Sequence, residues 1–436
     1  MTRQRYDNSR GQMGRIDSGR GYDTDLGFDR NQFYIGHEGR YRLGILNSTL
    51  YRNENENLGR LIPSAAVPED SPRVDSDRRL ESITNVLDTK FTMFPTDNHV
   101  VTVGGQYMDA ELTDGIPNRT FRNSQYALFV EDEWRMTPGL TLTSGLRYED
   151  NDTAGSELAP RGYLVWNTTD RITLKGGVAR GFRAPFLEQL EDGVIGFGDQ
   201  GQTALFGNPD LRAETSTNYE ISAIYDNRRN FFGQVTLFHI DLSNRIERPT
   251  AADGTTQEFA NVGEAVIQGV EFGVSYQFLE AWNISGNYTY IDSEDRRSGV
   301  EGINRGDPLF SVPEHSVNAR LGWHATPALE TFMTMEYRSS RFRPDSFHEP
   351  HLGGGAQGAA EALGDFRSFT VFSLGANYRF SENVRMTGEV LNLFDKDFNN
   401  YKPYPLRNDP DTIAFSNVYN HIYEPRRLFL SMTVDF

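Results

Sequence analysis

The side chains in this sequence that are best suited to chemistry are arginines that stand close to aromatic rings. One segment, YRSSRFRPDSFHEPH (337–351), contains Arg338, Arg341, Arg343, Phe342 and Phe347. A guanidinium group is planar and always charged, so it can pair with an anion and stack on a ring. These residue types in one short segment predict a binding site for an anionic ligand.

Four other arginines extend this prediction. Arg183, Arg296, Arg297 and Arg305 lie in two further segments of irregular pattern, and we expect them to face the same ligand. The alternative is that each is an ordinary solvated charge or contacts a lipid phosphate, which is the commoner situation for any single surface arginine. Both interpretations stay open at the level of the sequence.

Catalytic and metal-binding chemistry have weaker support. His348 and His351, with Glu349 between them, are potential metal ligands, but no third ligand follows at a suitable spacing. The chain has no cysteine, which excludes thiolate sites, and it has no nucleophile-elbow motif. Glu131 and Glu133 lie on the polar side of an alternating segment, so we interpret them as a polar lining rather than an acid–base pair. We predict no enzyme, no metal site and no cofactor.

The composition narrows the class of protein. The 436 residues carry 43 basic and 61 acidic side chains, a net charge of −18, so the chain lacks the basic surface that nucleic acid requires. Mean hydropathy is −0.58, and no stretch approaches the roughly 20 apolar residues of a membrane helix. A membrane β-barrel stays compatible, because only alternate residues of its strands face lipid.

The first residues, MTRQRYDNSRGQMGRIDSGRG, lack the apolar core of a secretory signal. Either the protein stays inside the cell or this is not its natural start.

Apolar and polar residues alternate in many segments along the chain. The last one places Leu428, Leu430, Met432, Val434 and Phe436 on one face. Comparable segments occur at 99–110, 123–135, 140–148, 171–180, 216–226, 231–240, 267–278, 281–290, 316–323, 328–338, 370–380 and 384–392. Each runs about ten residues, the length of a tilted strand that crosses a bilayer.

The connections between these segments alternate in length. Short polar turns occur at 136–139, 167–170, 226–230, 324–328 and 380–383, and long segments at 52–81, 109–124, 149–160, 181–215, 241–266, 291–314, 339–368 and 393–427. A β-sandwich has turns of mixed length at both ends, whereas strict alternation is typical of an up-and-down membrane barrel. We therefore predict an all-β, antiparallel transmembrane barrel whose long loops share one end.

Aromatic residues mark both ends of the predicted strands. The tryptophans beside short turns are Trp134, Trp166, Trp282 and Trp323, and the tyrosines at the opposite ends are Tyr107, Tyr148, Tyr290 and Tyr337. Two aromatic belts are what a bilayer selects, although aromatic residues also favour strands in general. The final strand, with its terminal aromatic, must pair with another strand to leave no edge in lipid.

Six segments carry a family resemblance: GFRAP (181–185), GNPDLRAETSTNYEIS (207–222), NVGEAVIQGVEFGVSY (261–276), SVPEHSVNARLGW (311–323), LNLFDKDF (391–398) and the EPRR ending. They resemble TonB-dependent outer-membrane siderophore receptors. Segments 99–107, 129–149 and 159–190 are most similar to the group of the colicin I receptor and the enterobactin receptor. The similarity runs in order along essentially the whole chain.

The resemblance implies a bacterial outer-membrane barrel of about 22 strands with an N-terminal plug. It implies uptake of ferric catecholate siderophores, energy supplied through TonB, and parasitism by colicins. It also implies that the terminal strand is recognised by the barrel-assembly machinery, that lipid and lipopolysaccharide surround the wall, and that Asn392 contacts a strand end or loop entry.

The chain departs from this family in length. Only about 18 strands fit between Met1 and Phe436, so we expect residues 1–436 to be the C-terminal portion of such a barrel without its plug. The alternatives are a passive channel without a plug, a non-functional fragment and, least favoured, a secreted β-protein.

Overall fold

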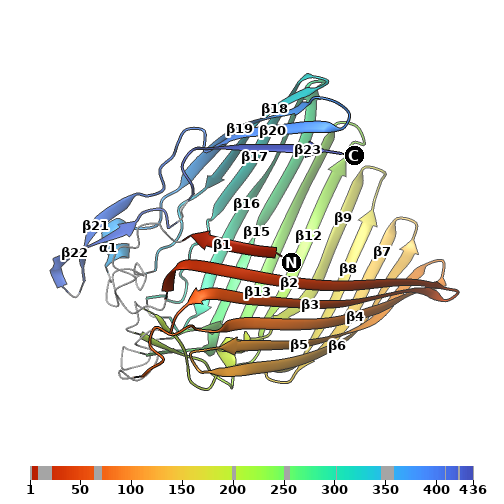
Figure 1. The fold of residues 1–436 in the computed structure, drawn as a ribbon. Coiled ribbons are helices and arrows are strands. Elements are labelled where there is room, and N and C mark those ends of the chain that lie inside the picture. Colours follow the sequence, from red (N-terminus) through yellow and green to blue (C-terminus); the bar gives the residue numbers. More distant parts are fainter. Residues whose placement is uncertain are drawn as a thin grey trace.

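The structure is a computed structural model that describes residues 2–7, 22–62, 71–198, 203–249, 256–300, 302–344, 358–407, 409–420 and 423–435. One large curved sheet of 18 strands dominates it (Figure 1), in agreement with the predicted number. The strands of this sheet are β1 Thr2–Asp7, β2 Tyr22–Tyr41, β3 Gly44–Arg60, β4 Leu80–Thr96, β5 His99–Asp114, β6 Arg119–Thr137, β7 Leu140–Asn151, β8 Gly155–Asn167, β9 Ile172–Arg183, β12 Glu214–Asp226, β13 Phe231–Glu247, β15 Ala260–Leu279, β16 Trp282–Arg297, β17 His315–Thr326, β18 Leu329–Arg338, β19 Phe369–Arg379, β20 Val384–Leu391 and β23 Arg427–Val434.

The sheet is an antiparallel meander. Each strand pairs with the next one in the order just given, so β9 pairs with β12, and β13 with β15. The final strand pairs with β20 over eight positions, from Val384↔Val434 to Leu391↔Arg427. In the described part of the chain β1 pairs only with β2 and β23 only with β20, so no closing pair joins the two ends of the sheet there.

The two faces of the wall differ as the alternation predicts. In β15, Val270, Phe272 and Val274 point outward, whereas Glu271 and Gly273 point into the barrel. The outward side chains have no protein layer above them, and Leu128, Ile221 and Leu237 are 62%, 68% and 53% exposed. Apolar side chains this exposed on a continuous surface indicate contact with lipid.

The tryptophans and tyrosines of the two predicted belts all lie on the outward face of the wall. All four tryptophans face outward at the ends of strands that meet in short turns, and Trp282 stacks on Trp323 with ring centroids 5.4 Å apart. The tyrosines lie on the same outward face, nearer the opposite rim of the wall, but Tyr107 and Tyr290 are each seven residues short of the ends of β5 and β16. We call these two rims the short-turn end and the long-loop end.

One row of register partners links the two belts. It runs across neighbouring strands through Trp134, Leu142, Leu164, Gly176, Ile221, Leu237, Val270 and Tyr290. Its seven steps of about 4.8 Å span about 34 Å. With strands tilted by about 40°, the row rises about 22 Å, close to the apolar band of about 25 Å. The register, combined with the usual strand spacing and tilt, therefore matches the apolar thickness of a membrane.

Two predicted long loops are wrong in extent. Segment 109–124 is mostly strand, because β5 continues to Asp114 and β6 begins at Arg119. Likewise, only residues 152–154 separate β7 from β8. These hairpins extend beyond the lipid-facing band and are held by polar pairs such as Arg122 to Glu111 at 2.8 Å. The apolar alternation stops at the membrane surface, and so the sequence pattern gave no sign of the extension.

The longest loops fold into small structures of their own at one end of the barrel (Figure 1). These are the 3₁₀ helix η2 Leu187–Leu190, the sheet of β10 Val194–Gly198, β11 Thr203–Phe206 and β14 Thr256–Glu258, the helix α1 Ala359–Leu363, and the hairpin of β21 Tyr401–Leu406 and β22 Asp409–Asn417. Among the residues described, no helix has the length and apolar character needed to cross a membrane.

The loop cluster comprises the β18–β19 and β20–β23 loops, which pack together. Its core contains Phe398, Val418 and Tyr419 packed against Phe369 at the start of β19. Asn392 holds the entry to the second loop, as predicted: its amide donates to the carbonyls of Lys396 at 2.9 Å and Glu424 at 3.3 Å and accepts from the Lys396 amide at 2.8 Å.

A first prediction concerns Phe332, which points inward from β18 with Gly322 and Gly375 as its register partners. A Cβ at Gly375 would overlap the Phe332 ring, so Gly375→Val should lower the free energy of unfolding by about 1–3 kcal/mol. Urea unfolding of the refolded barrel measures this. Adding Phe332→Leu should restore most of the loss, and failure to do so would show that the ring does not require the glycine.

A second prediction concerns the lipid-facing wall near its middle. Leu237→Arg should lower the unfolding free energy by about 2–4 kcal/mol, because a charge there faces hydrocarbon. The matched control is Gln234→Arg on the inward face of the same strand, which should cost less than about 1 kcal/mol. Equal costs in lipid vesicles would contradict the assignment of faces.

Candidate functional site along the inner wall and the loop cluster

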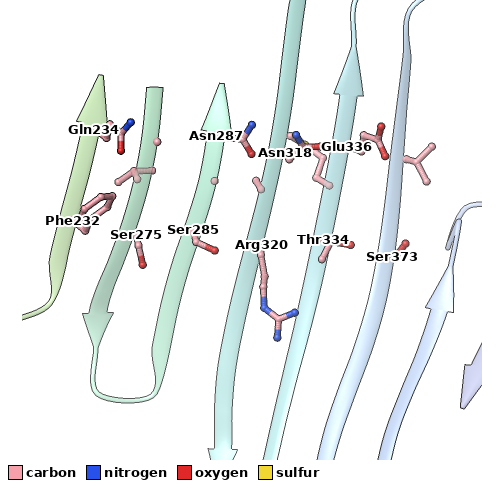
Figure 2. A pocket seen from close by; sticks show the side chains of 16 residues that line it. Phe232, Gln234, Ser275, Ser285, Asn287, Asn318, Arg320, Thr334, Glu336 and Ser373 are labelled. Carbon is pink, nitrogen blue, oxygen red and sulfur yellow. The ribbon is translucent and has the colours of Figure 1, made fainter. Parts of the chain in front are cut away.

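A polar hollow of about 600 Å³ lies on the inner wall across β13 to β19. Figure 2 shows its labelled side chains on successive strands: Phe232, Gln234, Ser275, Ser285, Asn287, Asn318, Arg320, Thr334, Glu336 and Ser373. Most are amides and hydroxyls, which can both donate and accept hydrogen bonds. The hollow can therefore hold water or a polar solute without imposing a strong charge.

The hollow exists because the inward positions carry small side chains. Ser275 and Ser285 are direct register partners, and Gly273 lies two residues from Ser275 on the same face. A Cβ at Gly273 would have no neighbour within 4 Å. Short side chains at these positions leave space that larger ones would fill.

At the short-turn side of the hollow, Arg320 is held by its neighbours. Its guanidinium donates to Glu330 at 2.9 Å and lies 3.7 Å from the centroid of the Phe332 ring. Glu330 also accepts from the Asn377 amide at 3.0 Å, and Thr387 donates to Asn377 at 2.9 Å. The charge of Arg320 is thus balanced within the wall.

At the long-loop side, Glu336 connects the wall to the loop cluster. It accepts a hydrogen bond of 2.8 Å from the Tyr423 hydroxyl and pairs with Arg338 at 3.0 Å. Burial, together with the hydrogen bond to Glu336, raises the pKa of Tyr423 to about 12. The hydroxyl therefore stays protonated and remains a donor across the physiological pH range.

Arg341 and Arg343 lie inside the loop cluster, where they are 5% and 2% exposed. Arg343 donates to the Ser416 hydroxyl at 2.6 Å and the Asn417 carbonyl at 3.3 Å, and its guanidinium lies 4.1 Å from the centroid of the Phe366 ring. Arg341 donates to the Tyr419 carbonyl, and burial lowers its pKa. These cations join the two loops, and neither is presented to solvent.

The other arginines of the predicted site are spread apart. Arg338 faces the lumen beside Glu336, and Arg183 pairs with Glu214 at 2.5 Å near the Phe186 ring. Arg305 is exposed in the loop between β16 and β17. The structure therefore joins Arg338, Arg341 and Arg343 in one region but does not gather all the predicted arginines around one ligand site.

Arg296 and Arg297 lie on the outer rim of the long-loop end. Arg296 approaches Asp241 at 3.7 Å, and Asp241 belongs to the outward-facing positions of β13. Arg297 pairs with Glu264 at 2.6 Å. Both therefore lie closer to the level of lipid head groups than to the lumen.

The remaining predicted residues give less information. Phe342 is half-buried, and Phe347, His348 and His351 lie outside the described residues. Within the described ranges, no group of three histidine or acidic side chains could hold a metal ion. Ligand binding by the arginines and phenylalanines stays a prediction.

The sequence analysis missed the polar hollow. Its labelled residues occupy inward positions on strands whose outward positions were assigned correctly. The alternation therefore already implied that Asn318 and Thr334 face the lumen. Tyr423 carried no comparable signal, because its partner Glu336 is 87 residues away in the chain.

Comparison with known proteins identifies relatives of this architecture. The family described as TonB dependent receptor-like, beta-barrel matches residues 2–393. The iron-regulated outer membrane virulence protein of Vibrio cholerae is 28% identical over 436 residues, covering 95% of this chain and 58% of that protein. The ferric enterobactin receptor PirA of Pseudomonas aeruginosa is 31% identical over 327 residues, covering 71% of this chain and 41% of that protein.

Solved structures share the fold. The siderophore receptor PirA from Acinetobacter baumannii superposes with a TM-score of 0.74 at 22% identity, over 94% of this chain and 63% of that one. A variant of the ferric enterobactin receptor from Pseudomonas aeruginosa, in complex with enterobactin, gives a TM-score of 0.73 at 23% identity, over 94% and 63% of the two chains. The present chain thus spans less than two thirds of the length of these relatives.

The family match covers the wall from β1 through β20, whose strands carry the alternating outward apolar and inward polar positions. On this evidence the chain belongs to the TonB-dependent receptor β-barrel family.

Proposed function

We propose that this chain forms the barrel wall, or a part of it, in an outer-membrane receptor that takes up ferric catecholate siderophores. Relatives named as enterobactin receptors match 62% to 71% of the chain. This likeness is the observation that supports ferric catecholates as the ligand class. The function would be binding and gated passage, with no covalent bond made or broken by the protein.

The geometry supports passage along the inner wall. The hollow offers amides and hydroxyls that can replace water around a polar solute, and Arg320, the cation at its short-turn side, is already paired. A bulky anion would therefore meet few fixed charges strong enough to hold it there. Recognition would instead occur at the mouth, by which we mean the opening of the barrel at its long-loop end. There Arg183 and Arg305 are exposed and Arg338 faces the lumen.

The partners follow from this assignment and are part of the proposal. TonB would supply the energy for uptake, and colicins would bind at the same mouth. The barrel-assembly machinery would recognise the outward set Leu428, Leu430, Met432 and Val434 of β23, with Phe436, which lies outside the described residues. Lipopolysaccharide would contact the outer rim that carries Arg296 and Arg297.

A passive channel, or a fragment without transport activity, is the second candidate. One observation favours it: no closing pair joins β1 and β23 in the described part of the sheet. Conductance across a planar bilayer separates the receptor from the channel, because a closed receptor should show no steady current and an open wall should conduct. An inactive fragment differs from both because it should fail to reach the heat-modifiable, protease-resistant state of a closed barrel.

A third prediction tests recognition at the mouth. Arg305→Glu should weaken binding of ferric enterobactin about tenfold, because the change replaces a favourable charge with a repulsive one. Quenching of tryptophan fluorescence in the purified barrel measures the affinity. The matched control is Arg228→Glu, an exposed arginine at a short turn, which should leave the affinity unchanged. Equal effects of the two changes would contradict recognition at the mouth.

A fourth prediction tests the loop cluster. Arg343→Met should destabilise the cluster by about 1–3 kcal/mol, because it leaves buried acceptors without their charged donor. Proteinase K should then cut the β18–β19 or β20–β23 loop at least severalfold faster in intact cells. Arg367→Met, an exposed arginine of the same loop, is the control. Unchanged cutting in the Arg343 variant would mean that the cluster does not depend on this cation.

A further inference from the structure

The outer face of the wall has an apolar groove that follows β9. Its floor is Gly176, and its walls are Leu164 and Trp166 on β8 and Ile221 and Leu237 on β12 and β13, with Leu174 at one end. The volume is about 630 Å³. Leu164, Gly176, Ile221 and Leu237 are consecutive members of the row that joins the two belts. The groove therefore faces hydrocarbon between the belts.

Packing within the sheet does not require a glycine at position 176. A Cβ at Gly176 would lie 3.4 Å from the Glu220 carbonyl oxygen and 3.7 Å from Cγ1 of Ile221, which are ordinary contacts. The flanking positions carry large apolar side chains, and so the absence of a side chain at this one position creates the hollow. A space of this kind in a lipid-facing wall can be filled only by another apolar group.

The end of the groove nearer the long loops is polar. Tyr219 and His239 line it, with ring centroids 6.1 Å apart. His239 lies 3.3 Å from Asp241 through Nε2 and 3.3 Å from the Gln268 side-chain oxygen through Nδ1. Arg296 reaches Asp241 from the other side at 3.7 Å. The guanidinium of Arg296 can pair with a phosphate, and the Gln268 amide and the Tyr219 hydroxyl can hydrogen-bond to a sugar, which are the two kinds of group in a phosphorylated sugar head group.

We propose that the groove binds one acyl chain of an outer-leaflet glycolipid, with its head group against His239, Asp241 and Arg296. A single chain fits a narrow groove with ridges on both sides, and the polar cluster continues from its upper end. A second copy of this protein is a poorer occupant, because its surface would have to remove water from the Asp241–Arg296 pair. This inference deepens the contact with lipopolysaccharide proposed above for the rim that carries Arg296, and it does not rest on the proposed ligand of the lumen.

The test is native mass spectrometry of the detergent-solubilised barrel after incubation with purified lipid A. We expect one retained lipid A per barrel, and Gly176→Leu, which fills the groove, should reduce the retained fraction at least tenfold. The matched control is Gly105→Leu on the outward face of β5, where a Cβ would meet its nearest atoms at 3.3 Å. This control should retain lipid A as the unchanged barrel does.

A second variant covers failure of Gly176→Leu to fold, which heat-dependent mobility on a gel would reveal. Ile221→Ala with Leu237→Ala removes both far walls and should also lower retention severalfold. Equal retention in the folded variants, or none in the unchanged barrel, would overturn the proposal. A dimer without bound lipid would assign the groove to a second copy, and preference for dioleoyl phosphatidylethanolamine over lipid A would overturn the outer-leaflet assignment.

Discussion

Pairing of the backbone in hydrocarbon is the constraint on which this structure depends. A backbone amide or carbonyl group inside a bilayer has no water to hydrogen-bond with, so each strand must form its backbone hydrogen bonds with the neighbouring strands. Here seventeen neighbouring pairs run without interruption from β1 to β23. Because register determines the face that each side chain takes, the same ladder builds both the polar lumen and the lipid-facing surface.

The two surfaces use glycine in opposite ways. On the inner face Gly375 makes room for the ring of Phe332, which in turn contacts Arg320. On the outer face Gly176 has no ring above it and leaves a groove. The residue type alone therefore does not reveal its use. The cross-strand partner and the face decide whether a missing side chain completes packing or opens a binding surface.

The sequence predicted the wall well and the loops poorly, for a physical reason. Side chains of a strand alternate between its two faces, so the outward face could be predicted from the sequence. Tryptophans beside the short turns, such as Trp134 and Trp323, then indicated which end of each strand carries the short turn. Beyond the bilayer this pattern is lost, and β5 and β6 therefore continue unnoticed into a region predicted as loop. The burial of Arg343 was also hidden, because Ser416, which accepts its hydrogen bond, is 73 residues away. A solvated arginine and a buried one look the same in a chain of irregular pattern.

The loop cluster also has a consequence for the order of folding. Most of the wall consists of contacts between consecutive strands, which close short loops and cost little chain entropy. The bonds from Arg341 and Arg343 reach residues 78 and 73 positions later, so they can form only after β19 and β20 have brought the two loops together. The mouth of the barrel is therefore one of the last parts to reach its final shape, and a chain that stalls before the two loops meet would present a finished wall with an unfinished entrance.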